Sequence, residues 1–162
     1  MPVGTGRDAA DGGAPPGCSV QSRTGAAERG KDEHETVGIL NAQLARALAE
    51  LGHGHLVVVG DAGLPRPSGV ECVDLAVELG VPTFAQVLTA VAAELVTEQA
   101  VLAEEAIAAN PGVVDLVAKL AHQPVFVPHE ELKRLSQDAW VYIRTGEATP
   151  YANVVLRCGV PF

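Results

Sequence analysis

The sequence contains no long apolar run and no paired cysteines, and both absences narrow the class of protein. No stretch approaches the roughly 18 uninterrupted apolar residues of a membrane-spanning helix, and the first residues lack the apolar segment of a signal peptide. The three cysteines, Cys18, Cys72 and Cys158, are odd in number and widely spaced, which fits neither a disulfide framework nor a CxxC metal site. We therefore expect a soluble protein of the reducing cytoplasm.

Basic residues are also scarce, because the chain has 11 Lys and Arg against 20 Asp and Glu, a formal net charge of -9. An acidic surface repels the phosphate backbone of nucleic acid. Lys133 and Arg134 are the only adjacent cations, and no aromatic platform for stacking bases accompanies them. The composition therefore argues against nucleic acid as a partner.

The chain does have enough apolar material for one core. Its 162 residues are 48% hydrophobic and 19% charged, which is the balance of a globular domain rather than of a disordered chain. Residues 1–36 differ, because they hold seven of the 17 glycines and almost no large apolar side chain. We expect residues 1–36 to be a flexible N-terminal extension and residues 37–162 to form a single domain.

Four segments are predicted helices. Asn41 and Thr83 can each cap a helix, because their side-chain oxygens can accept hydrogen bonds from the free amides of a first turn. Pro128 is followed by acidic residues, which together favour the start of another helix. The predicted helices cover residues 41–52, 83–95, 113–121 and 129–135.

The predicted strands are short runs rich in β-branched residues, at 56–59, 98–103, 125–127, 139–144 and 153–158. Apolar residues alternate with polar ones over residues 73–79, which favours a further strand or its edge, although a helix is possible there. Strands that alternate with helices predict an α/β fold with helices on both faces of a sheet. In such sheets the loops at strand ends usually carry the chemistry.

Histidines lie at several of the predicted element ends. Imidazole can both give and accept protons near neutral pH, so His53, His55 and His129 are candidates for acid/base chemistry. His34 lies in the predicted extension and His122 at the end of a helix, and we interpret both as surface residues.

Three polar residues accompany these histidines, and each has an ordinary structural interpretation as well. Asp61 follows the predicted strand at 56–59 and can cap a turn through its own backbone contacts. Tyr151 and Asn153 follow Pro150 and can belong to a turn that leads into the last strand.

A metal site is a further possibility for the same residues. His53, His55, Asp61 and His129 supply ligands of the kind that zinc accepts. Their spacing lacks the HExxH helix and the CxxC pairs of strong metal signatures. We therefore prefer the acid/base interpretation and expect no metal.

Seven sequence blocks follow one another in order: GILN (38–41), LGHGH (51–55), DAGLP (61–65), GVPTFAQVL (80–88), AEE (103–105), PHEELK (128–133) and IRTGEATPYANVVLRCGV (143–160). From residue 37 to the C-terminus, the chain resembles the D-ribose pyranase family in these blocks. The resemblance implies a single three-layer α/β/α domain with a mixed, mostly parallel sheet. It also implies an enzyme that interconverts the pyranose and furanose forms of D-ribose and needs no cofactor.

By the matched blocks, His53 corresponds to the family's catalytic proton donor. The family's sugar-binding positions correspond to Asp61, His129, Tyr151, Ala152 and Asn153. The resemblance further implies a ring-shaped homo-oligomer, typically a decamer, with each sugar pocket at a subunit boundary. Two departures are His55, where relatives carry an acidic residue, and the N-terminal extension.

Other functions stay open at this point. The substrate can be fucose or another monosaccharide, since the sister family of fucose mutarotases shares the GHG block, although DAGLP and GVPTFAQVL resemble the ribose branch. A non-catalytic sugar-binding accessory of a transport or phosphorylation system is a second alternative, and a metal-dependent enzyme is a third.

Overall fold

The computed structural model describes residues 38–121 and 124–162. The extension predicted for residues 1–36 and His122 lie outside the described residues, so the division of the chain at residue 37 stays a prediction. The strands are β1 (Leu56–Gly60), β2 (Glu71–Asp74), β3 (Thr97–Ala103), β4 (Val125–Val127), β5 (Val141–Arg144) and β6 (Val154–Cys158). The helices are α1 (Ala42–Ala49), α2 (Phe84–Glu94), α3 (Glu105–Ala109), α4 (Pro111–Ala121), α5 (His129–Leu135) and the 3-10 helix η1 (Ser136–Asp138).

The described strands form one mixed sheet in the order β2-β5-β1-β6-β3-β4. β1, β2 and β5 run parallel to one another, as do β3 and β4. β6 lies between these two groups and runs antiparallel to both β1 and β3. These directions confirm the predicted mixed, mostly parallel sheet. They also place the carboxyl ends of β1 and β5 beside the amino end of β6.

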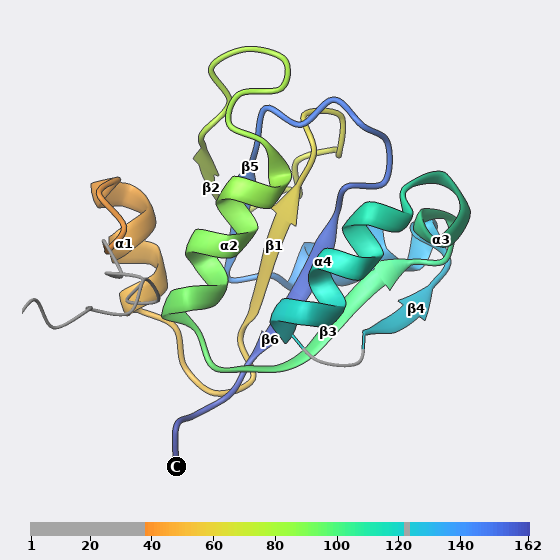
Figure 1. Ribbon diagram of the computed structural model, residues 1–162. Helices are drawn as coiled ribbons and strands as arrows, with labels where there is room; N and C mark the ends of the chain where they lie inside the picture. The colour runs from red at the N-terminus through yellow and green to blue at the C-terminus, as the bar shows by residue number, and fades with distance from the viewer. Residues whose placement is uncertain (1–37, 122–123) are drawn as a thin grey trace, which may run out of the picture. The chain divides into compact units, whose positions relative to one another are not determined.

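Helices α1, α2 and α4 cover one face of the sheet (Figure 1). The apolar stripes of these helices pack on the strand side chains that point to this face. Every second residue of β1 points to it, because side chains along a strand alternate between the two faces. Fully buried side chains of this layer include Val57, Val59, Phe84, Leu88, Val91, Val117, Ile143 and Leu156. Burying a Val, Leu or Phe stabilises a fold by about 1.5–3 kcal/mol, so this layer is the main core.

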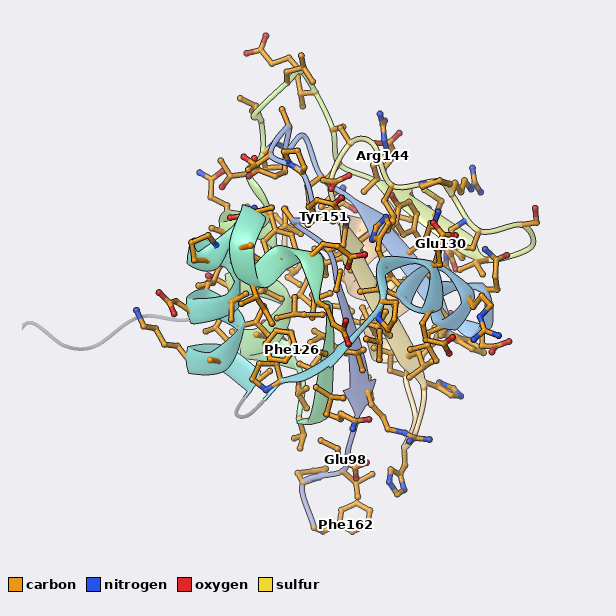
Figure 2. All side chains as sticks on the ribbon, turned by 90° about the vertical axis from the view of Figure 1, so that its right-hand side faces the viewer. Glu98, Phe126, Glu130, Arg144, Tyr151 and Phe162 are labelled. Atoms are coloured by element: carbon orange, nitrogen blue, oxygen red, sulfur yellow. The ribbon has the colours of Figure 1, made fainter. Side chains whose placement is uncertain are left out.

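The other face is covered by α5 and η1. Leu132 of α5 is fully buried there, against Val58, Tyr142 and Val155 of the sheet. Figure 2 shows α5, the helix that carries Glu130, on the opposite side of the sheet from α4. The predicted three-layer α/β/α architecture is therefore confirmed.

Local capping signals define the starts of α1 and α2 as predicted. The side chain of Asn41 accepts a hydrogen bond from the backbone N–H of Leu44 at 2.9 Å. Thr83 and Gln86 form a reciprocal capping box at the start of α2. The predicted end of the first helix is too late, since α1 ends at Ala49 with Glu50 as its C-cap, before Gly52.

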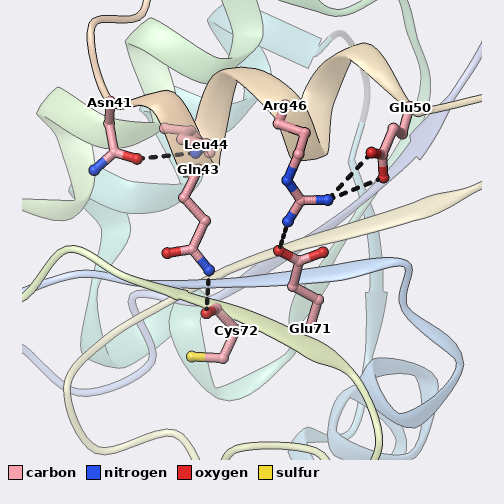
Figure 3. Close-up of polar contacts among 7 residues, drawn as sticks. All are labelled: Asn41, Gln43, Leu44, Arg46, Glu50, Glu71 and Cys72. Carbon is pink, nitrogen blue, oxygen red and sulfur yellow. Dashed lines mark hydrogen bonds and ion pairs between the residues drawn. The ribbon is translucent and has the colours of Figure 1, made fainter.

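Polar contacts attach α1 to the edge strand β2 (Figure 3). Gln43 Nε2 donates to the carbonyl oxygen of Cys72 at 3.1 Å. Arg46 pairs with Glu71 of β2 and, at 3.1 Å, with Glu50 of its own helix. The side chains of α1 thus occupy part of the sheet edge that β2 would otherwise leave open.

The strand predicted for residues 73–79 is wrong beyond residue 74. β2 ends at Asp74, because β5, the strand it pairs with, ends at Arg144. The chain then folds back on itself, with the N–H of Val77 donating to the carbonyl oxygen of Val81 at 3.0 Å. Val77 and Leu79 are consequently 82% and 78% exposed, although their alternation is typical of a half-buried strand.

The sequence patterns did not predict α3 or η1. Both are shorter than the segments in which helical periodicity can be recognised. No helix in the described part of the chain has the length and apolar character needed to cross a membrane.

Candidate active site

A cavity of about 680 Å³ lies at the carboxyl ends of β1 and β5, beside the amino end of β6. Pockets for small molecules typically measure about 300–1,000 Å³. Its walls are formed by Asp61, Ala62, Gly63, Leu64, Leu79, His129, Arg144, Glu147, Ala148, Pro150, Tyr151 and Asn153. Asp61, His129, Tyr151 and Asn153 were predicted from the sequence, and the structure brings them together; Ala152, which was also predicted, is fully buried between Tyr151 and Asn153.

Asp61 and Asn153 face each other across two neighbouring antiparallel strands. Asn153 Nδ2 donates to Asp61 Oδ2 at 2.9 Å, and the backbone N–H of Asp61 donates to Asn153 Oδ1 at 2.8 Å. The backbone N–H of Gly63 donates to Asp61 Oδ1 at 2.9 Å. Asp61 is 7% and Asn153 1% exposed, and a buried carboxylate needs such partners. Since a carboxylate can accept about four hydrogen bonds, Asp61 keeps capacity for a ligand hydroxyl.

Gly60 makes room for this pair. A Cβ at position 60 would lie 2.9 Å from Leu64 Cδ2, 3.0 Å from Tyr142 Cε2 and 3.1 Å from Asn153 Oδ1. The same point of β1 is fixed by Thr145, whose N–H and hydroxyl both donate to the carbonyl oxygen of Gly60, at 2.9 and 2.8 Å. The end of β1 is thus held tightly where the cavity begins.

The loop between β5 and β6 folds around the carboxylate of Glu147. Glu147 Oε1 accepts from the N–H groups of Ala148 and Thr149 and from the Thr149 hydroxyl, at 3.1, 3.0 and 2.7 Å. Glu147 Oε2 accepts from the N–H of Phe84 at 3.3 Å. Partial burial raises the pKa of Glu147, but these hydrogen bonds outweigh it and hold the pKa below its ordinary value. Glu147 therefore organises the loop as a carboxylate.

This loop presents Tyr151 to His129. Tyr151 has a φ of 62°, a left-handed conformation that is uncommon for a bulky residue and typical of functional sites. Its ring meets the imidazole of His129 edge-on, with centroids 5.2 Å apart and planes at 89°. His129 Nδ1 is buried and has no hydrogen-bond partner among the described residues. His129 also lines the cavity, and a buried polar atom without a partner often marks a functional residue.

Arg144 is a cavity residue that the sequence analysis did not single out. It ends β5, and its guanidinium donates to Asp74 Oδ2 at 3.0 Å and to the carbonyl oxygen of Ala62 at 3.3 Å. Asp61 was noticed because it follows a strand, and the same criterion applied to the end of the strand at 139–144 finds Arg144. The cavity thus combines carboxylate, guanidinium, imidazole, phenol and amide groups, which together suit a ligand with several hydroxyls.

His53 does not line this cavity. His53 precedes β1 and Asp61 follows β1. The five residues of this strand span about 16 Å and separate the two side chains. His53 Nε2 lies 2.9 Å from Glu98 Oε1, and the His53 side chain is 61% exposed. Figure 2 shows Glu98 at the lower end of the domain and Tyr151 and Arg144 toward the upper end. Within one chain, the predicted catalytic histidine and the predicted sugar-binding residues are therefore apart.

His55 has a structural place in the turn before β1. Its ring stacks on Trp140, with centroids 4.6 Å apart and planes at 6°. Its Nδ1 accepts a hydrogen bond from the backbone N–H of Gly52 at 3.0 Å. An imidazole nitrogen thus serves here as the acceptor that closes the turn.

The metal-binding alternative required His53, His55, Asp61 and His129 to converge. Asp61 and His129 line the cavity, whereas His53 and His55 lie at the other edge of the sheet. No three His, Cys, Asp or Glu side chains within residues 38–121 and 124–162 are grouped so that they could hold a metal ion. The described geometry gives this alternative no ligand set.

Comparison with protein families places this arrangement in context. The family model described as the RbsD / FucU transport protein family matches residues 35–161. The chain belongs to the RbsD / FucU family. That match spans every strand and helix described above.

Two relatives in the RbsD / FucU family have high sequence identity to this chain. D-ribose pyranase 1 of Rubrobacter xylanophilus is 57% identical over 125 residues, and the D-ribose pyranase of Streptomyces avermitilis is 58% identical over 125 residues. Each alignment covers 77% of this chain and 97% of the relative.

Solved structures of the RbsD / FucU family share the fold. Bacillus subtilis RbsD, solved in complex with D-ribose, is 42% identical with a TM-score of 0.74, covering 77% of this chain and 97% of that chain. FucU from Bifidobacterium longum is 23% identical with a TM-score of 0.63, covering 74% and 95%. The second comparison supports the fold alone.

Proposed function

We propose that this protein catalyses the interconversion of the pyranose and furanose forms of D-ribose. The observation that carries the proposal is the 57% identity to a D-ribose pyranase over 97% of that relative's length. The cavity agrees with it, because the cavity is lined by hydrogen-bonding groups suited to a monosaccharide.

The reaction needs proton transfer and no change of oxidation state. A base removes the proton of the anomeric hydroxyl, the bond from the anomeric carbon to the ring oxygen breaks, and the ring oxygen takes up a proton, which yields the open-chain aldehyde. Closure reverses these steps through a different hydroxyl. We assign the proton transfers to the imidazole of His53, since imidazole can act as acid and base near neutral pH.

The residues of the cavity are proposed to bind the sugar. Asp61 can accept from a sugar hydroxyl with its remaining lone pairs, and the imidazole of His129, which lines the cavity, can pair with another. The Tyr151 hydroxyl and the second amide hydrogen of Asn153 offer further contacts. The backbone of Ala152 lies between these two residues and completes the proposed binding set.

We further propose that a second copy of the chain supplies His53 to each cavity. His53 and the cavity lie at opposite edges of the sheet in one chain, and His53 is exposed. Val77 and Leu79 are exposed beside the cavity, and Leu79 is part of its wall. Exposed apolar side chains of this kind suit a surface that a partner covers. Head-to-tail contacts of this kind form a ring when the rotation between subunits closes, and the family resemblance implies a ring-shaped decamer.

The cellular setting follows from the same proposal. We place the protein in the cytoplasm, because the spacing of its three cysteines fits no disulfide framework. We place it in ribose catabolism because of the proposed reaction. D-ribose is the proposed partner molecule, and no cofactor is assigned to the reaction.

Saturation-transfer NMR of ribose anomers tests the activity directly. The wild-type protein should raise the exchange rate above that of buffer, and His53→Ala should remove about a 100- to 10,000-fold enhancement. Fucose and other monosaccharides in the same experiment define the specificity. An exchange rate with the wild-type protein equal to that in buffer would exclude catalysis. Enhanced exchange of fucose but not of ribose would identify fucose as the substrate.

Mixing two impaired variants at a ribose concentration below KM tests the shared site. His53→Ala lacks the proton-transfer group and His129→Phe lacks a group of the cavity, so each alone should be weak. Co-expressed chains should recover activity, since about a quarter of the sites in a mixed head-to-tail ring combine two intact halves. No recovery in mixed oligomers of normal size would mean that each chain uses its own His53.

A further inference from the structure

The imidazole of His53 has a partner that the sequence analysis did not consider. His53 Nε2 and Glu98 Oε1 are 2.9 Å apart. Because a carboxylate oxygen only accepts hydrogen bonds, this contact favours the tautomer with the proton on Nε2. Neutral imidazole carries one proton, so Nδ1 is left with its lone pair free. The contact therefore favours Nδ1 as the nitrogen of His53 that accepts a proton.

The backbone of β3 is built to present Glu98 at this place. Thr97 pairs with Cys158 and Gln99 pairs with Arg157, so Glu98 is an extra residue in the ladder between β3 and β6. Such a β-bulge bends the strand locally and redirects a side chain. Glu98 leaves the regular alternation of β3 and meets a residue of the turn before β1.

A glycine opposite the bulge provides the space. A Cβ at Gly159 would lie 2.7 Å from Glu98 Cγ and 3.2 Å from Glu98 Oε1. The backbone of Gly159 is fixed, because its N–H donates to the carbonyl oxygen of Val96 at 2.7 Å. Any larger residue at position 159 would therefore displace the Glu98 side chain from this position.

The turn that carries His53 is attached to the same segment. The N–H of Gly54 donates to the carbonyl oxygen of Cys158 at 2.8 Å, and the N–H of Cys158 donates to the carbonyl oxygen of His55 at 2.9 Å. His53 and Glu98 are therefore both held relative to residues 158–159. A simple surface ion pair, which contributes about 0–1 kcal/mol, requires neither a bulge nor a glycine.

We infer that Glu98 is a positioning residue for His53, a role that rests on the proposed function. The carboxylate keeps the proton on Nε2 and leaves Nδ1 to take the proton of the anomeric hydroxyl. When Nδ1 has taken that proton, the imidazolium stays beside the Glu98 carboxylate until Nδ1 passes the proton to the ring oxygen. Ring closure uses the same two transfers in the reverse direction, so His53 and Glu98 end unchanged.

Three variants separate this role from a structural one. Glu98→Ala removes the acceptor, Glu98→Gln keeps an acceptor oxygen without the charge, and Gly159→Ala displaces an intact carboxylate. Glu94→Gln is the matched control, since Glu94 is exposed at the end of α2 and is not among the residues that line the cavity. Thermal unfolding checks that each variant is folded.

Activity and tautomer are then measured on the full chain. Glu98→Ala and Gly159→Ala should lower kcat roughly 10- to 100-fold, the range for groups that orient a functional histidine. KM should stay near the wild-type value, because neither change alters the cavity. Glu98→Gln should lie between wild type and Glu98→Ala, and Glu94→Gln should match wild type.

Nitrogen-15 NMR of the His53 ring reports the tautomer without any substrate. Wild type and Glu98→Gln should carry the neutral-state proton on Nε2, and Glu98→Ala should show a mixture of both tautomers. Wild-type kcat together with an unchanged tautomer in Glu98→Ala would overturn the role of Glu98. Absence of wild-type activity would instead contradict the proposed reaction. The nitrogen-15 spectra of His53 would still test whether Glu98 sets its tautomer.

Discussion

Asp61 and Asn153 are 92 residues apart in the sequence and form a mutually hydrogen-bonded pair at the wall of the cavity. The amide of Asn153 donates to the carboxylate of Asp61 and accepts from its backbone N–H. Asn153 is thus a support for Asp61 as well as a proposed contact for the sugar. Losing it should affect both stability and binding.

Asn153→Ala should lower the free energy of unfolding by about 1–3 kcal/mol, because it leaves polar groups of Asp61 buried without their partners. Urea denaturation measures this loss. Gln137→Ala, on the exposed surface of η1, should change the same quantity by less than about 0.5 kcal/mol. Equal effects of the two substitutions would show that the Asp61 pair adds no stability.

Two glycine substitutions should change the free energy of unfolding in opposite directions. Gly60→Ala should destabilise the fold by about 1–3 kcal/mol, since its Cβ would meet Leu64, Tyr142 and Asn153. Gly112→Ala, in α4 with nothing within 4 Å of the added Cβ, should stabilise it by up to about 1 kcal/mol. Thermal or urea unfolding of the two variants provides the comparison. A neutral Gly60→Ala would mean that the end of β1 relaxes easily.

Local signals made much of the fold predictable. Asn41 and Thr83 were identified as helix caps from residue type and the apolar spacing that follows, and both cap helices through their side chains. The strand at residues 56–59 was predicted because a run of β-branched residues fits the centre of a sheet. Each of these decisions depends on neighbours within a few residues, which a single sequence contains.

Contacts between distant segments could not be predicted in this way. Val77 and Leu79 alternate as in a strand, but their partner strand ends too early, and that length is set elsewhere in the chain. Glu98 acquires its orientation from a bulge whose register depends on β6. The candidate site was predicted in its residue types, whereas the distance between His53 and the cavity required the three-dimensional arrangement.

Acid should abolish the stabilising effect of Glu147. Hydrogen bonds from Thr149, Phe84 and Ala148 hold its pKa below the ordinary value of 4.5 in the folded protein. A carboxyl group with a depressed folded pKa stabilises the fold above its unfolded pKa and loses that effect as the pH falls through the folded pKa.

Glu147→Gln should therefore lower the free energy of unfolding at neutral pH, and the difference from wild type should shrink as the pH falls below 4.5. Urea denaturation over a series of pH values measures this. Glu104→Gln, exposed and without a side-chain capping contact at the start of α3, should give no such trend. A difference that stays constant with pH would show that the loop does not depend on the charge of Glu147.

His129→Phe should weaken ribose binding while the fold is kept. The phenyl ring can still meet Tyr151 edge-on, as the imidazole does, but the imidazole nitrogens are lost. Loss of one hydrogen bond to the sugar should raise the Kd for D-ribose by about 3- to 10-fold, which isothermal titration calorimetry measures. Glu130→Gln, the next residue of α5 and exposed outside the cavity, should leave the Kd unchanged. A wild-type Kd in folded His129→Phe would remove His129 from the binding site.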